Sequence, residues 1–273
     1  ALNANDSVSV ADINAGKLVF TPGASGNGVG YASFSFQVQD DGGTANGGVD
    51  TVTNTFTINV AAVNDAPTIV FALANVGVLE DAGPQTVSGF VAASTGPADE
   101  AGQSITNYTV STSNGGLFSV APAIALNGTL TFTSATNANG SATVTVIAQD
   151  DGGTANGGAN TDPAPKTLTI NVTSVNDAPS GASTTVTTLE DNAYTFTASD
   201  FGFTDPNDAP ANTLTNVKIT TLPGAGTLRD NGVNVTAGQF VSIADINGGK
   251  LVFTPAANGN GAGYASFTFQ VQD

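Results

Sequence analysis

The chain contains no cysteine, histidine, methionine or tryptophan among its 273 residues. Without cysteine it forms no disulfide, and cysteine usage gives no information about the redox state of the compartment in which the protein works. Without histidine or cysteine it also lacks the commonest general base, the thiol nucleophile and the usual zinc ligands. Pairs of carboxylates can still catalyse glycoside hydrolysis. Because the other usual catalytic side chains are missing, however, we expect that the protein is not an enzyme.

Basic residues are scarce as well, because 5 Lys and Arg stand against 22 Asp and Glu, for a net charge of −17. Such an acidic chain repels the phosphate backbone of nucleic acids and the surface of anionic membranes. No apolar run approaches the ~20 residues of a membrane-spanning helix. We therefore expect no nucleic-acid partner and no membrane insertion in this segment, and the acidic side chains must be solvated or held by cations.

The chain is rich in internal repeats. VNDAP occurs at Val63–Pro67 and again at Val175–Pro179, and QDDGGTANGG occurs at Gln39–Gly48 and again at Gln149–Gly158. A longer segment, ADINAGKLVFTP, returns 233 residues later as ADINGGKLVFTP, starting at Ala244. Three residues further on, GNGVGYASFSFQVQD at Gly26–Asp40 returns at the same offset as GNGAGYASFTFQVQD at Gly259–Asp273. Repeats of this kind predict an array of similar folded units.

The offsets predict three units along the chain. Residues 1–64 form the C-terminal part of a long-type repeat, 65–176 a complete short-type repeat, and 177–273 a long-type repeat without its last strand. Both ends of the sequence fall inside a unit, so we expect the chain to be a window on a longer array.

Each unit shows the period-two alternation of a half-buried strand, with Thr, Ser, Asn or Gln on the wet face. Clusters of Gly, Asn and Asp between these runs indicate turns, and no segment keeps a helical period. Seven short strands in about 110 residues are typical of an immunoglobulin-like sandwich. The predicted fold is therefore all-β, with tandem Greek-key immunoglobulin- or cadherin-like β-sandwiches in a linear array. In the complete unit the strands are expected at Thr68–Val78, Thr86–Val91, Ile105–Ser111, Leu117–Val120, Thr129–Thr133, Ala142–Gln149 and Thr167–Val175.

The acidic residues fall in the loops of these predicted sandwiches. If strands A to G alternate in direction, the B–C and F–G loops lie where the chain enters a unit, and the A–B loop lies where it leaves. Acids from separate segments then meet at each junction. The first junction would hold Asn64, Asp65, Asp99, Glu100, Asp150 and Asp151; the second would hold Glu80, Asp81, Asn176, Asp177, Asp205, Asn207, Asp208 and Asp273. The same plan places Asp40 and Asp41 at the start of the first unit, and Glu190 and Asp191 at the far end of the last.

So many carboxylates in one place repel one another unless a cation lies between them. Calcium takes 6–8 oxygen ligands from carboxylates, amides and backbone carbonyls in flexible geometry, whereas magnesium keeps its waters and demands a regular octahedron. The pattern therefore predicts calcium as the cofactor, bound between neighbouring repeats of the same chain. The plainer alternative treats each acidic motif as a tight turn or a solvated loop.

These motifs also resemble those of known repeat proteins. VNDAP resembles the interdomain signature of cadherins, AQDDGG at Ala148–Gly153 resembles their AxDxG motif, and DPND at Asp205–Asp208 resembles their DxD motif. The chain resembles most closely the bacterial cadherin-like and immunoglobulin-like tandem repeats of giant secreted adhesins of the RTX type. The resemblance implies a protein of the bacterial cell surface or exterior, stiffened by calcium and used in adhesion, biofilm or cell–cell contact. Ala62 and Ser174 replace the first acid of the cadherin signature, so we expect one or two ions per junction.

Two other functions stay open at the level of sequence. The chain could be a subunit of an extracellular filament, in which residues 52–63 of another copy complete the last unit by strand addition. Against this, residues 1–40 and 234–273 duplicate one part of a unit, so head-to-tail joining leaves one copy redundant. The chain could instead bind carbohydrate, with Tyr31, Tyr108, Tyr194 and Tyr264 stacking on sugars. Tyr31 and Tyr264 occupy one repeat position, however, which favours a packing role.

Overall fold

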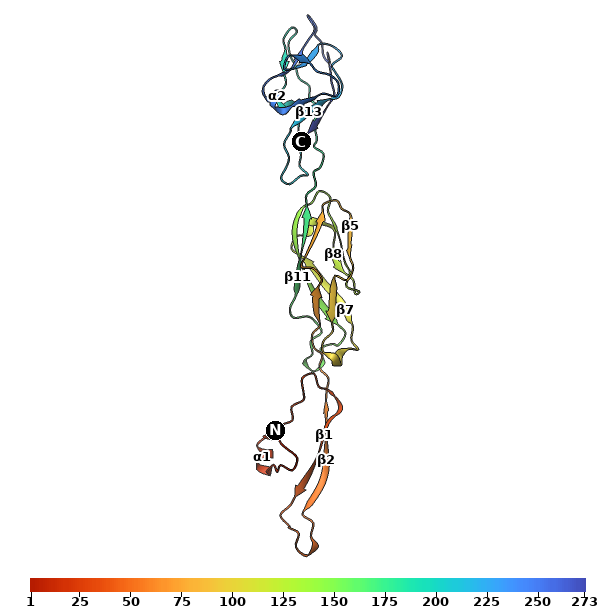
Figure 1. Ribbon diagram of the computed structural model, residues 1–273, viewed down its shortest axis with the longest axis vertical. Helices are drawn as coiled ribbons and strands as arrows, with labels where there is room; N and C mark the ends of the chain where they lie inside the picture. The colour runs from red at the N-terminus through yellow and green to blue at the C-terminus, as the bar shows by residue number, and fades with distance from the viewer.

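The computed structural model describes residues 1–273 as three bodies arranged in a line (Figure 1). A β-hairpin lies at one end, a body rich in strands lies in the middle, and a second such body lies at the other end. The chain passes once from each body to the next, so the two connections are the only covalent joints between them. We name the meeting of the hairpin with the middle unit the first junction, and the meeting of the middle unit with the last unit the second junction.

The hairpin consists of β1 (Gly28–Gln39) and β2 (Thr51–Val60), joined by a turn that contains the 3-10 helix η1 (Ala45–Gly47). The two strands pair antiparallel, with Phe34 opposite Phe56. The preceding segment contains one short helix, α1 (Val10–Asn14). None of the first 66 residues is buried, and the Phe34 and Phe56 rings stack while 46% and 54% exposed. The hairpin therefore has an apolar face but no core of its own.

The middle unit contains two layers of sheet. One layer is a four-stranded sheet in the order β4-β11-β10-β7, in which β4 runs parallel to β11 and the other neighbours are antiparallel. The facing layer consists of the pair β3-β6 and the three-stranded sheet β5-β9-β8. The strands are β3 (Thr68–Phe71), β4 (Asn75–Leu79), β5 (Pro84–Val87), β6 (Val91–Ser94), β7 (Ile105–Thr112), β8 (Phe118–Ile124), β9 (Leu130–Ser134), β10 (Gly140–Asp150) and β11 (Lys166–Thr173), with 3-10 helices η2 (Ala98–Glu100), η3 (Gly115–Leu117) and η4 (Ala155–Gly157).

Both layers contribute to one core of 15 buried residues. Along β10 the side chains alternate, so that Ala142, Val144, Val146 and Ala148 are buried while their neighbours are not. Phe132 of β9 faces them from the other layer and packs edge-on against Phe118. The period of two read from the sequence is thus the alternation between core and solvent.

The last unit has a smaller core of nine buried residues, among them Phe201, Val217 and Leu251. Its sheets have the orders β12-β17-β14-β15 and β16-β13-β18. The elements are β12 (Tyr194–Thr195), η5 (Ala198–Phe201), β13 (Asn216–Ile219), β14 (Thr227–Asp230), β15 (Val233–Asn234), β16 (Phe240–Ser242), α2 (Ile243–Asn247), β17 (Leu251–Thr254) and β18 (Phe269–Gln272). β18 pairs with β13 on one side and has no partner on the other.

The prediction of an all-β chain is confirmed, because strands in several sheets dominate and helices are few and short. Two segments that were each predicted as one continuous strand are interrupted in the structure. Thr68–Val78 is divided at residues 72–74, and its halves join opposite layers as β3 and β4. Thr86–Val91 spans the break between β5 and β6, which again belong to different pairings. A strand at the edge of a sandwich can change layers in this way, and alternation within each half does not reveal it.

Helices α1 and α2 were not predicted, since five residues are too few to show a helical period. They occupy the same position in the two copies of the ADIN repeat. Ser9 and Ser242 cap them by accepting a hydrogen bond from the amides of Asp12 and Asp245. The serine three residues before an aspartate is a capping signal that was available in the sequence. No helix in the chain has the length and apolar character needed to cross a bilayer.

Candidate metal sites at the two junctions

At the first junction, two loops of the middle unit close around the VNDAP linker. Asn64 donates from Nδ2 to Oδ1 of Asp150 at 3.1 Å and to the carbonyl of Ala159 at 2.7 Å. The amide of Asp65 donates to Oε1 of Glu100 at 2.5 Å. Asp150 is the last residue of the core strand β10, whereas Glu100 belongs to η2, so segments far apart in sequence meet at the linker. Asp99 and Asp151 lie in the same two loops and are exposed.

Several acceptor oxygens at this junction are buried without any hydrogen-bond partner. Glu100 and Asp150 are 4% and 2% exposed, and each keeps one carboxylate oxygen unpaired. A Cβ added to Gly152 would overlap the amide oxygens of both Asn64 and Gln103, so these two atoms face one space. Buried polar atoms almost always have a partner, which makes such a group of acceptors unusual. The unpaired atoms are Asn64 Oδ1, Glu100 Oε2, Gln103 Oε1, Asp150 Oδ2 and Asp162 Oδ2.

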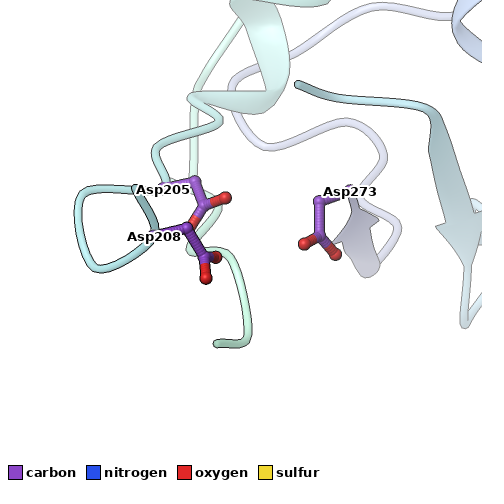
Figure 2. A group of neighbouring side chains, drawn as sticks. All are labelled: Asp205, Asp208 and Asp273. Atoms are coloured by element: carbon purple, nitrogen blue, oxygen red, sulfur yellow. The ribbon is translucent and has the colours of Figure 1, made fainter. Parts of the chain in front are cut away.

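The second junction contains the tightest acidic group of the chain. One carboxylate oxygen each from Asp205, Asp208 and Asp273 lie within 4.8 Å of one another. Figure 2 shows Asp205 and Asp208 on one loop, with Asp273 approaching from the end of β18. Two oxygens bound on opposite sides of a calcium ion at about 2.4 Å stand about 4.8 Å apart. The three carboxylates are therefore close enough together to hold one metal ion.

The VNDAP linker joins this group as it does at the first junction. The amide of Asp177 donates to Asp208 Oδ1 at 3.1 Å, just as the amide of Asp65 donates to Glu100. Asn212 donates from Nδ2 to Asp208 and Asp273, both at 3.3 Å, and also to the amide oxygen of Asn176. Oδ2 of Asp177 and Oδ1 of Asp205 are buried and have no partner.

Glu80 and Asp81 reach the second junction from the middle unit. Glu80 is 2% exposed, and its Oε1 accepts from the amide of Val175 at 2.6 Å and from Ser174 Oγ at 3.0 Å. These hydrogen bonds, the one from Val175 first, lower the pKa of Glu80, so it is a fixed negative charge. Ser174 therefore helps to orient the Glu80 carboxylate at this junction.

The electrostatics of the second junction are unfavourable without a cation. Burial, and then the charges of Asp81, Asp208 and Glu80, raise the pKa of Asp177. Burial also raises the pKa of Asp205, and the neighbouring Asp208 and Asp273 add to the rise. No basic side chain compensates, because the two ion pairs of the chain, Lys17–Asp12 and Lys250–Asp245, involve no junction residue. Burial and like charge therefore both disfavour the ionised form of these two carboxyls.

The remaining predicted residues lie as follows. Asp99 accepts from Asn27 of the hairpin body at 2.7 Å and so links the two bodies, whereas Asp151 accepts from the amide of Ser104 within its own unit. Asn207 is half-buried, and its side chain makes no hydrogen bond. Two exposed pairs lie away from both junctions: Asp40 and Asp41 in the turn of the hairpin, and Glu190 and Asp191, which bind Asn260 and Asn258.

Sequence reasoning missed three residues of these sites. Asn212 is the common donor of the second junction, while Gln103 and Asp162 each contribute an unpaired oxygen at or near the first. Asp162 was detectable, because it lies with Asp151 in the β10–β11 connection that begins after Asp150. Asn212 and Gln103 follow acidic loops but belong to no repeated motif, so the sequence carries no signal for them.

The four tyrosines are spread over the three bodies: Tyr31 in the hairpin body, Tyr108 in the middle unit, and Tyr194 and Tyr264 in the last unit. Tyr108 is buried in the middle core, and Tyr194 donates from its hydroxyl to Asp200. Tyr31 and Tyr264 accept from the amides of Gly23 and Ala256, the same contact in two copies of the repeat. Tyr31 and Tyr264 therefore make equivalent intramolecular contacts at one repeat position.

No protein-family model matches the chain, and no curated protein matches it. The inference of function therefore rests on the residues and their geometry.

A pH dependence follows from the raised pKa of Asp205. A carboxyl whose folded pKa lies above its ordinary value of 3.8 binds more protons in the folded than in the unfolded state between the two values. Stability of the calcium-free protein should therefore fall as the pH rises from about 4 through the raised pKa. Thermal unfolding should show this fall to be smaller in an Asp205→Asn variant. An identical profile for both proteins would contradict the prediction.

Proposed function

We propose that the chain is part of the calcium-stiffened stalk of a large extracellular bacterial adhesin. The observation that carries the proposal is the group of buried, unpaired oxygens at each junction, gathered from separate segments and without any basic side chain. A cation there binds the linker and the loops of a unit at once. Stiffening follows, because a joint tied through an ion cannot bend without losing ligands.

Each unit of this stalk is an immunoglobulin- or cadherin-like Greek-key sandwich. The strand order of the middle unit supports this, since β4-β11-β10-β7 corresponds to A′-G-F-C, and the facing layer contains A, B, E and D. The parallel pairing of a divided first strand with the last strand agrees with the same assignment. The row of bodies in Figure 1 supports a role as a spacer that carries other domains away from the cell.

The residues assigned to calcium differ between the two junctions. At the first, Glu100, Asp150 and Asn64 would be the central ligands, with Gln103 and the nearby acids completing the set. At the second, Asp205, Asp208 and Asp273 would hold one ion, with Asp177 and Glu80 beside it. Calcium supplies the positive charge that these acceptors lack, and catalysis is not part of the proposed role.

The proposal is tested by the shape of the molecule in solution. Adding calcium to the chelated protein should increase the maximum dimension measured by small-angle X-ray scattering and narrow the distribution of distances. Magnesium at the same concentration should have a much smaller effect, because it tolerates irregular oxygen cages poorly. Unchanged scattering together with an unchanged unfolding temperature on calcium addition would refute the stalk as described.

A further inference from the structure

A side-chain amide follows the acidic loop at each junction. Gln103 comes three residues after Glu100, and Asn212 comes four residues after Asp208. Glu100 and Asp208 hold equivalent places, because each accepts a hydrogen bond from the backbone amide of the linker aspartate. The residues that follow are also alike, Ser-Ile-Thr after Gln103 and Thr-Leu-Thr after Asn212. The two amide side chains therefore occupy one position of the repeated plan.

At the first junction this amide turns its oxygen inward. Gln103 Oε1 is buried without a partner, and so is Oδ1 of the linker residue Asn64. A Cβ added to Gly152 would lie 2.6 Å from the first oxygen and 1.7 Å from the second, so both atoms border one small space. Glu100 and Asp150 each contribute a further unpaired oxygen to this junction. The unpaired atoms are thus all acceptors, which suit a cation and no hydrogen-bond acceptor.

At the second junction the corresponding amide turns its nitrogen inward. Asn212 donates from Nδ2 to Oδ1 of the linker residue Asn176 at 2.5 Å. The same nitrogen donates to Oδ2 of Asp208 and to Oδ2 of Asp273, both at 3.3 Å. One nitrogen that carries two hydrogens thus lies among three oxygens from separate segments. It supplies part of the positive charge that these oxygens would receive from a bound cation.

The Asn212 side chain can present either end without a movement of the backbone. The backbone N–H of Asn212 donates to Oδ2 of Asp205 at 3.1 Å, which fixes the residue in its loop. Rotation by about 180° about the Cβ–Cγ bond exchanges Nδ2 and Oδ1, and the preference of this terminal torsion is broad. An amide nitrogen does not bind calcium, whereas an amide oxygen is a common calcium ligand. An ion at the junction therefore selects the end opposite to the one that faces the acids here.

We propose that Asn212 is a calcium ligand that exchanges ends as the ion binds, and that Gln103 is its equivalent at the first junction. Without calcium, the Asn212 nitrogen ties the linker to the acidic loop. With calcium, the Asn212 oxygen faces the ion, as the Gln103 oxygen faces the space beside Asn64. The inference rests on the proposed calcium sites and adds to them a residue that keeps the joint closed when the ion is absent.

Calorimetry on full-length variants tests the role as a ligand. Asn212→Asp presents an oxygen at either end, so the dissociation constant for calcium at the second junction should fall about tenfold, because affinity rises with the number of charged ligands. Asn212→Ala presents no oxygen and should raise that constant about tenfold. Both variants should lower the unfolding temperature of the last unit in the calcium-free protein, because both lose the donor. A bystander at this position would change neither constant.

The matched control, Gln239→Glu, adds the same charge to the same unit. The carbonyl of Gln239 accepts from the amide of Ile219 at one end of β13, whereas Thr215, which contacts Asp273, precedes the other end. A strand of four residues separates these ends by about 13 Å. Gln239 Oε1 accepts from the amide of Thr236, and a glutamate keeps that hydrogen bond. The control should change the dissociation constant less than about twofold, since salt screens charges at such a separation.

NMR of the ¹⁵N-labelled chain tests the exchange of ends itself. The side-chain N–H signals of Asn212 are assigned by their absence from the Asn212→Asp spectrum, and without calcium they should be protected from exchange with water. Saturating calcium should speed their exchange at least about tenfold, because the N–H groups leave their charged acceptors. Unchanged or stronger protection, or an Asn212→Asp chain that binds calcium no more tightly than the unsubstituted chain, would overturn this inference alone. An unsubstituted chain that binds no calcium would overturn the proposed function and this inference with it.

Discussion

Replacing Asp205 and Asp208 with Asn should weaken calcium binding at the second junction by about 100-fold or more. Even groups that only orient metal ligands contribute about 10–100-fold to affinity, and these two carboxylates are proposed as direct ligands that share one site. Isothermal titration calorimetry on the full chain would measure the change. The first junction, which depends on Glu100 and Asp150, should keep its affinity in the same experiment.

The matched control removes the same charge from the same unit. Asp230→Asn with Asp245→Asn changes the net charge equally, but Asp245 pairs with Lys250 and neither aspartate belongs to the acidic group. This control should leave both affinities nearly unchanged. If both double variants lose affinity alike, the acids act only through long-range charge, and the second junction is not a site.

Loss of the site should also remove the stabilisation that calcium provides. A ligand that binds only the folded state at 100 times its dissociation constant adds about 2.7 kcal/mol to the free energy of unfolding. Replacing Asp205 and Asp208 should abolish that gain for the last unit while the middle unit keeps its own. This difference separates a specific site from general screening of repulsion.

Replacing Phe132 with Ala should lower the free energy of unfolding of the middle unit by about 3–5 kcal/mol, because a buried ring is lost and a cavity remains. Phe132 is 1% exposed, packs on Phe118 and belongs to the layer facing β10. Native-state hydrogen exchange at the amides of Val144 and Val146 would report on this unit alone. Core strands of this kind exchange through global opening of their unit.

The neighbouring Thr131→Ala provides the control on the same strand. Thr131 points to the opposite face and is exposed, so its loss should cost about 1 kcal/mol or less. Similar losses for the two variants would contradict the assignment of the two faces of β9. Unchanged exchange in the last unit would show that the units open independently.

The two largest effects concern different parts of the molecule. The effect of Phe132→Ala is confined to one core, whereas the effect of the aspartate variants is confined to a joint between units. A stalk requires both properties, since rigid units joined by loose linkers do not project anything. The scattering experiment on calcium addition connects them, because it reports on the joints while the cores stay folded.

The repeats and the alternation along each strand were sufficient to predict β-structure and the positions of most strands. Strands β7, β9, β10 and β11 of the middle unit lie within a few residues of their predicted ranges. Alternation is local and survives in any sandwich that buries one face of each strand. The divided strands and the capped helices α1 and α2 were missed, because a change of layer depends on the facing sheet and a five-residue helix shows no period.

The sequence by itself determined which residue types are present: carboxylates and amides in repeated loops, and too few basic side chains to neutralise them. Only the tertiary structure decided which of them meet. It placed Asn212 between Asp208 and Asp273, and it left oxygens of Glu100 and Asp150 buried and unpaired. Composition and periodicity can be read directly along the chain. The residues of a junction come from loops that are far apart in sequence, so their geometry is defined only after the sheets have packed.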